Sequence, residues 1–279
     1  MEPITITPDM VGKQLRLVDS PSPPPPPEDP TPDISTAQPL FSFVNPSKAE
    51  ELRYNSWAND VRANRQTGHP QFAFSDGQVI EVSMRTDPPR IINGALHCYI
   101  NRGFKDPSGH CEWRPRTPEL IKSTYLALGV TYVWRLVVRF ADFTLERVNK
   151  YPTSHITFLQ VAGPPGIKSP PALALQTYRR AWRVQSFADG LDNSIYFGEP
   201  DAVEHEWWVR YRPAFDETGL LQVWQDQQLV ADISGPTHYR PPASKQGWAG
   251  QQRFGAYATP TAEPVSVQFE SAYIWKVSD

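Results

Sequence analysis

The stretch TYVWRLVVRFA, residues 131–141, decides the fold class that the sequence predicts. Large apolar residues alternate along it, and Arg135 and Arg139 occupy two of the intervening positions. The apolar positions are Tyr132, Trp134, Leu136, Val138 and Phe140. Because successive side chains of a strand point to opposite faces, this pattern predicts a strand with one face in the core.

Similar segments follow on both sides of this stretch, and most of the loops between them contain proline or glycine. They are residues 78–84, 95–101, 156–161, 172–177, 182–187, 206–212, 220–225 and 229–233. Asp226-Gln227 is predicted to be a hairpin turn. A last strand is predicted to carry four apolar side chains on one face, namely Val267, Phe269, Tyr273 and Trp275.

One short helix is expected before these strands. Ser47 and Glu50 have the S-x-x-E spacing of a capping box, which is typical of a helix start. About a dozen short strands with so little helix favour an all-β sandwich or jelly roll.

Proline divides the chain into two parts. Nine of the 30 prolines lie in residues 20–39, and the first aromatic residue of the chain is Phe41. A segment of this composition cannot bury enough apolar surface to fold alone. We therefore expect residues 1–38 to be a largely disordered docking peptide and polyproline spacer, and residues 39–279 to form one β domain.

Charge and hydropathy exclude some classes of function. The chain has 27 basic and 30 acidic residues, so it lacks the large positive excess of a non-specific nucleic-acid binder. No apolar run is long enough to span a membrane. Residues 1–18 show no signal peptide, although we expect an extracellular protein.

The chain has two cysteines. Cys98 and Cys111 are predicted either to pair or to remain buried thiols.

Most motifs of catalysis and metal binding are absent. There is no dinucleotide-binding glycine motif, P-loop or zinc-protease motif, and no two of the six histidines have metal-ligand spacing. The loop 189–193, Asp-Gly-Leu-Asp-Asn, is either a structural calcium site or a solvated turn. No other cofactor is expected.

Several polar residues interrupt segments that otherwise have the composition of a core. Glu112, Arg114 and Arg116 share one face of a strand, and Gln160 is predicted on the face of Ile156 and Phe158. Arg253, Gly255 and Tyr257 are predicted to point in one direction, with the glycine leaving room for a ligand.

Five short motifs occur in an order that resembles a known family. They are Arg114-Pro115-Arg116 with Glu119-Leu120, Phe158-Leu159-Gln160-Val161-Ala162, Glu206-Trp207-Trp208-Val209, Gly219-Leu220-Leu221-Gln222-Val223-Trp224 and Arg253-Phe254-Gly255-Ala256-Tyr257. Their order is similar to that of polysaccharide lyases with a concanavalin-like jelly roll, the group of heparin lyase I-like, glucuronan and alginate lyases. The resemblance covers about two thirds of the chain.

The resemblance implies β-elimination on an anionic polysaccharide that contains uronic acid. Tyr257 would act as base and acid, since nearby cations can lower the pKa of a phenol from about 10. The residues implied to neutralise the uronate carboxylate are Gln160, Arg114 and Arg116. Arg253, Glu119, His97 and Trp248 are implied to bind substrate.

The chain departs from the family pattern at two of these positions. Ala162 replaces the family histidine, and Arg253 replaces the family lysine. His97 or His155 would have to supply the missing imidazole. Strand alternation predicts His155 on the face opposite Gln160, which favours His97.

Two other functions are consistent with the same residues. One is a non-catalytic glycan-binding or adhesion module in which tryptophans stack on sugar rings. The candidate tryptophans are Trp113, Trp182, Trp207, Trp208 and Trp248. The other is a structural component of a larger assembly, docked on another protein through residues 1–18.

Overall fold

A computed structural model describes eleven parts of the chain. They are residues 32–35, 37–44, 71–73, 79–81, 90–100, 109–113, 125–141, 155–162, 170–240, 248–258 and 265–277. The helix expected at Ser47 lies outside them, as do residues 1–31. In the parts described, the secondary structure is entirely β.

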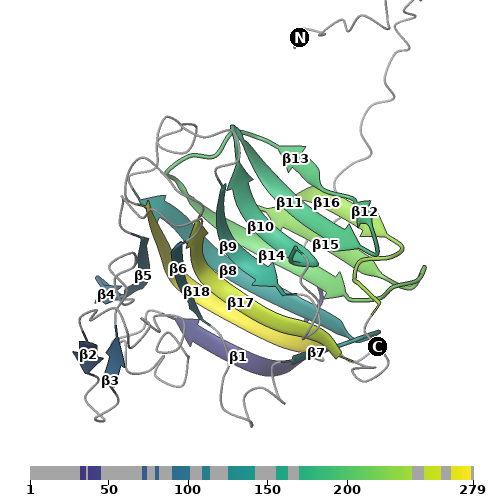
Figure 1. The fold of residues 1–279 in the computed structure, drawn as a ribbon, viewed down its shortest axis with the longest axis horizontal. Coiled ribbons are helices and arrows are strands. Elements are labelled where there is room, and N and C mark those ends of the chain that lie inside the picture. The colour runs from purple at the N-terminus through teal and green to yellow at the C-terminus, as the bar shows by residue number, and fades with distance from the viewer. Residues whose placement is uncertain are drawn as a thin grey trace, which may run out of the picture.

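Two antiparallel sheets form the body of the protein (Figure 1). Sheet I has the strand order β16 (Gln228–Ser234), β15 (Leu220–Gln225), β14 (Glu204–Arg212), β8 (Thr131–Ala141), β18 (Val265–Val277), β5 (Ala95–Ile100) and β4 (Arg90–Ile92), with β1 (Gln38–Val44) paired to β18. Sheet II has the order β12 (Leu191–Asp192), β11 (Ala181–Ala188), β10 (Leu173–Tyr178), β9 (His155–Val161), β17 (Trp248–Ala258) and β6 (Gly109–Trp113), with β13 (Ile195–Phe197) paired to β11 and β7 (Tyr125–Ala127) paired to β17. A separate hairpin contains β2 (Gln71–Ala73) and β3 (Val79–Glu81).

The connections between these strands are those of a jelly roll. In sheet I, β8 lies between β14 and β18, and in sheet II, β17 lies between β9 and β6. Strands far apart in sequence are therefore neighbours, because the chain moves from one sheet to the other. The predicted all-β jelly-roll sandwich is confirmed, and it contains no helix that could cross a membrane in the parts of the chain described.

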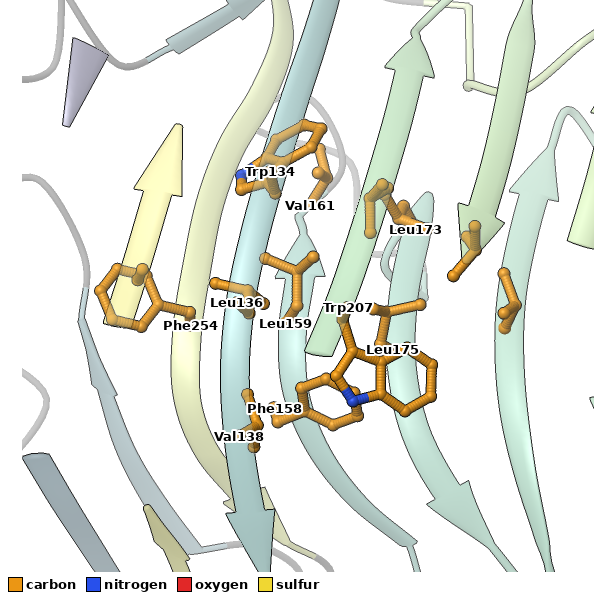
Figure 2. Packing of buried hydrophobic residues seen from close by; sticks show 14 of the residues in the cluster. Trp134, Leu136, Val138, Phe158, Leu159, Val161, Leu173, Leu175, Trp207 and Phe254 are labelled. Carbon is orange, nitrogen blue, oxygen red and sulfur yellow. The ribbon is translucent and has the colours of Figure 1, made fainter. Parts of the chain in front are cut away.

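Aromatic side chains fill the space between the sheets. Phe158 of sheet II packs edge-on against Phe140 of sheet I, with ring centroids 5.7 Å apart, and lies 5.1 Å from Trp207. Figure 2 shows Phe158 and Trp207 among aliphatic side chains of both sheets. Trp134 donates a hydrogen bond from its indole nitrogen to Gln252 Oε1 at 2.9 Å, which satisfies one buried polar group of each sheet.

The predicted turn at Asp226-Gln227 is confirmed. Both residues have positive φ, 49° and 68°, as a type I′ hairpin turn requires. The turn joins β15 to β16, and β15 has the predicted bounds.

The prediction for the last strand is wrong in one respect. Val267 and Phe269 face the core, but Tyr273 and Trp275 lie on the opposite face, where their rings stack 5.2 Å apart. The pairing of β18 with β8 shifts between Phe269 and Ser271, so that one extra residue reverses the alternation.

Candidate functional site

The candidate site begins with an irregularity in β9. Phe158 and Leu159 are adjacent in sequence, yet both are buried in the core cluster (Figure 2). The pairing of β9 with β10 and with β17 shifts at this point: Leu159 pairs with Leu175 and Phe254, whereas Thr157 pairs with Gln176 and Tyr257. The alternation of inward and outward side chains is therefore reversed between Leu159 and Thr157.

This reversal corrects two expectations. Gln160 was expected on the face of Ile156 and Phe158, but it lies on the outer face of sheet II, the face turned away from the core. His155 was expected opposite Gln160, but it lies on the same outer face. Because the consecutive residues Phe158 and Leu159 both point into the core, every side chain before them in β9 points to the face opposite the one that regular alternation from Gln160 predicts.

Tyr257 lies beside His155 on this outer face. Their ring centroids are 5.4 Å apart, with an interplanar angle of 53°. Both side chains are half-buried. Uninterrupted alternation along β9 predicts His155 on the other face and so favours His97 as the substitute imidazole. The structure instead brings His155 to the tyrosine.

Arg253 and Gln160 are direct partners in the pairing of β17 with β9. Partners of this kind have Cβ atoms about 5 Å apart, so their side chains can contact one ligand group together. Gln160 is 4% exposed, and Arg253 is half-buried. Between Arg253 and Tyr257, Gly255 has a φ of 140°, a conformation that favours glycine.

A chain of buried amides supports this part of the outer face. Thr157 Oγ1 donates to Gln176 Oε1 at 2.9 Å, and Gln176 Nε2 donates to Gln185 Oε1 at 3.1 Å. Gln185 Nε2 then donates to the carbonyl of Pro171 at 2.9 Å. Buried hydrogen-bonded side chains of this kind hold one another in fixed positions. The face next to Tyr257 is therefore both polar and rigid.

The other predicted site residues lie in different places. Arg114, Arg116 and Glu119 are outside the described residues. Trp248 begins β17 and pairs with Ala127, and its side chain is outside the described part. His97 belongs to β5 of sheet I, where it pairs with Gln268 and Arg90, so the structure does not bring it to the outer face of sheet II.

Two of the tryptophans considered for sugar stacking are excluded from that role because they are buried in the core. Trp182 and Trp207 are 2% and 1% exposed and pack on each other in the core, with ring centroids 5.3 Å apart. Trp208 lies on the outer face of sheet I and stacks on Trp275. The side chains of Trp113 and Trp248 are outside the described part.

The acidic loop 189–193 is a turn in which both aspartates have partners. Asp189 Oδ1 accepts a hydrogen bond from the Arg240 amide at 2.9 Å, and Asp192 Oδ1 accepts one from the Ser194 amide at 3.0 Å. No group of three acidic, histidine or cysteine side chains suited to a metal ion occurs among the described residues.

Cys98 is buried in β5, and the side chain of Cys111 lies outside the described part.

Another histidine, His205 on sheet I, has two acidic partners. His205 Nδ1 is 2.5 Å from Asp226 Oδ2, and His205 Nε2 is 2.9 Å from Asp201 Oδ1. Burial of the ring opposes its protonation, but the hydrogen bonds and charges of Asp226 and Asp201 outweigh that effect and raise the pKa of His205. This cluster joins the β15–β16 turn to β14.

Solved structures with a similar fold include polysaccharide lyases. Alginate lyase A1-II', a member of polysaccharide lyase family 7, is 13% identical with a TM-score of 0.51, and the match covers 75% of this chain and 94% of that chain. The family 7 alginate lyase AlyA1 from Zobellia galactanivorans is 10% identical with a TM-score of 0.50, covering 73% and 86%. Endo-β-1,4-glucuronan lyase from the fungus Trichoderma reesei is 16% identical with a TM-score of 0.48, covering 66% and 81%.

These likenesses concern the fold, since the identities are far below those at which residue roles can be transferred. The resemblance drawn from the five motifs is thus confirmed for the jelly roll itself. No protein-family model matches the chain, and no curated protein matches it in sequence.

Proposed function

We propose that the protein is a polysaccharide lyase that cleaves an acidic, uronate-containing polysaccharide by β-elimination. The observation that carries this proposal is the arrangement on the outer face of sheet II. There, Tyr257 contacts His155, and the paired residues Gln160 and Arg253 lie on the same face. A phenol and an imidazole can transfer protons, and an amide and a guanidinium can stabilise a negatively charged carboxylate.

The first requirement of the reaction is to stabilise negative charge on the uronate carboxylate. The proton at C5 is weakly acidic beside an ionised carboxylate, because its removal adds charge to the same group. The amide of Gln160 and the guanidinium of Arg253 can donate hydrogen bonds to that carboxylate, with Arg114 and Arg116 as further candidates from the sequence. These donors stabilise the enolate-like transition state more than the ground state.

The second requirement is a pair of proton transfers. While His155 holds the phenolic proton, the Tyr257 oxygen takes the C5 proton, and the electrons of the C5–H bond form the C4–C5 double bond. The C4–O bond then breaks, and the departing oxygen takes the proton from Tyr257. The products are one unsaturated uronate end and one new hydroxyl end, so that no water is consumed.

His155 is the positioning and proton-holding partner of Tyr257 in this proposal. Its ring lies against the phenol, and β9 holds it at the edge of the buried amide chain that starts at Thr157. The alanine at position 162 therefore does not deprive the site of an imidazole.

A substrate panel tests the proposal. The full chain is mixed with alginate, glucuronan, heparin-type and pectic polymers, and the ultraviolet absorbance of the unsaturated uronate product is followed. Increasing absorbance with at least one polymer supports lyase activity. Saturable binding without any absorbance change across the panel would replace the proposal with the non-catalytic glycan-binding function.

A further inference from the structure

A cluster of two tyrosines and two arginines lies on the outer face of sheet II, beyond the proposed catalytic residues. We call it the tyrosine platform, and it consists of Tyr178, Arg179, Arg183 and Tyr196. Tyr178 is the direct pairing partner of His155 on the neighbouring strand. The platform therefore begins beside His155 and extends across β10 and β11 to β13.

Arg183 fixes the two tyrosine rings in place. Its guanidinium carbon lies 4.9 Å from the ring centroid of Tyr178 and 5.4 Å from that of Tyr196. The guanidinium also donates a hydrogen bond to Ser194 Oγ at 3.0 Å and lies 3.6 Å from Asp192. Since Arg183 is only 9% exposed, these contacts are protected from solvent, which strengthens them.

The platform nevertheless leaves apolar and charged surface accessible. Tyr196 is 50% exposed although it is a large aromatic residue, and its ring centroid is 5.9 Å from that of Tyr178. Arg179 is exposed, and its guanidinium carbon lies 5.4 Å from the Tyr178 ring centroid. Arg179 has a φ of 57°, an uncommon value for a residue with a side chain. The exposed Tyr196 ring and the exposed Arg179 cation are both next to Tyr178, and together they suit a sugar that carries a carboxylate.

We propose that the tyrosine platform binds a second uronate residue of the polymer, several sugar units from the bond that is cleaved. The apolar face of the sugar stacks on Tyr196, and its carboxylate pairs with Arg179. Tyr196 is four strand spacings from Tyr257, which corresponds to about 19 Å at about 4.8 Å per strand. This inference rests on the proposed function for the identity of the polymer, but its binding step does not require turnover.

The experiment measures the affinity of size-fractionated oligoglucuronates and alginate oligosaccharides by calorimetry. The full chain carries Tyr257→Phe, so that the oligosaccharides remain intact. Tyr196→Ala and Arg179→Ala are added separately, and each is expected to weaken the binding of long oligosaccharides by about tenfold. The shortest oligosaccharides that bind do not reach the platform, so their affinity should be unchanged.

Arg180→Ala is the matched control, because Arg180 is the exposed neighbour of Arg179 and pairs with Glu199. It removes the same charge and should leave both affinities unchanged. Equal losses for long and short oligosaccharides, or no loss in either platform variant, would overturn the platform. Equal weakening by Arg180→Ala would also overturn it, because net charge alone would then account for the effect.

The two proposals can fail separately. If the wild-type protein cleaves a uronate polymer and the platform variants bind long oligosaccharides normally, the platform is wrong and the lyase stands. If uronate oligosaccharides bind with the expected length dependence but no polymer is cleaved, the platform stands and the lyase is wrong.

Discussion

The imidazole of His155 and the phenol of Tyr257 lie on adjacent strands with their ring centroids 5.4 Å apart. The contact depends on the irregularity at Phe158, because regular alternation from Gln160 would turn His155 toward the core. A local irregularity of backbone pairing therefore determines which titratable groups are neighbours.

Removing the phenolic hydroxyl of Tyr257 should abolish turnover while leaving substrate affinity nearly unchanged. Tyr257→Phe keeps the ring beside His155 but removes the atom proposed to accept and donate the proton. We expect kcat to fall by at least about 100-fold, measured by ultraviolet absorbance, with affinity measured by calorimetry. Tyr273→Phe, at a half-buried tyrosine of sheet I, is the control and should retain full activity. Parallel loss of binding and turnover in Tyr257→Phe would refute the proposed role.

Replacing His155 should reduce kcat more than it changes KM. In His155→Gln the side chain keeps hydrogen-bonding capacity but loses the imidazole, and we expect a decrease on the order of 100-fold in kcat. Imidazole added to the solution should restore part of the activity of a smaller variant, His155→Ala. A normal kcat in both variants would show that the contact with Tyr257 is structural only.

The His205 cluster should make stability depend on pH. Since the pKa of His205 is raised in the folded protein, its contribution is fully present below about pH 6.5 and is lost as the pH rises through the higher folded value. The free energy of unfolding, measured with urea at a series of pH values, should show this decrease.

Asp226→Asn provides the matched test of the same cluster. The asparagine retains an oxygen to accept the hydrogen bond from the Glu206 amide, so mainly the negative charge beside His205 is lost. We expect the variant to lose stability at pH 6 and to differ much less from the wild type at pH 8. An equal loss of stability at both pH values would mean that the charge on His205 does not contribute to the effect of Asp226→Asn.

Gly219→Ala should destabilise the fold by a close backbone contact. A Cβ atom at Gly219 would lie 2.1 Å from the carbonyl oxygen of Gly235 and 2.8 Å from Thr237 Oγ1. The strand ends would have to separate, at a cost of at least about 1–3 kcal/mol in the free energy of unfolding. Gly190→Ala is the comparison, because a Cβ there meets nothing within 4 Å and only its φ of 87° opposes the change. A larger loss in Gly190→Ala would contradict the contact argument.

The buried face of a strand could be predicted from the sequence where inward and outward side chains alternate without interruption. In β8, alternation from Tyr132 to Phe140 correctly indicated the buried face, and Asp226-Gln227 correctly indicated the turn after β15. In such segments, burying one face stabilises a single register, and a shift by one residue would expose every apolar side chain.

The sequence was insufficient where a strand changes its inward face. The order Thr157, Phe158, Leu159, Gln160 has two apolar residues between two polar ones, and this doublet was the signal that could have indicated the change. In β18, Phe269 and Ser271 pair with the consecutive residues Val138 and Val137, so Glu270 is the extra residue that changes the inward face. Local patterns do not show such shifts reliably, because they depend on pairing with strands that are distant in sequence.

The contact of Ile34 has a consequence for how the protein is presented to large molecules. Ile34 packs against a cluster formed by Val133, Trp208 and Trp224 on sheet I. Ile34 therefore lies on the outer side of sheet I, whereas Tyr257 and Tyr196 lie on the outer side of sheet II. A polymer bound at the proposed site would thus lie on the side of the molecule opposite Ile34, and the two would not compete for space.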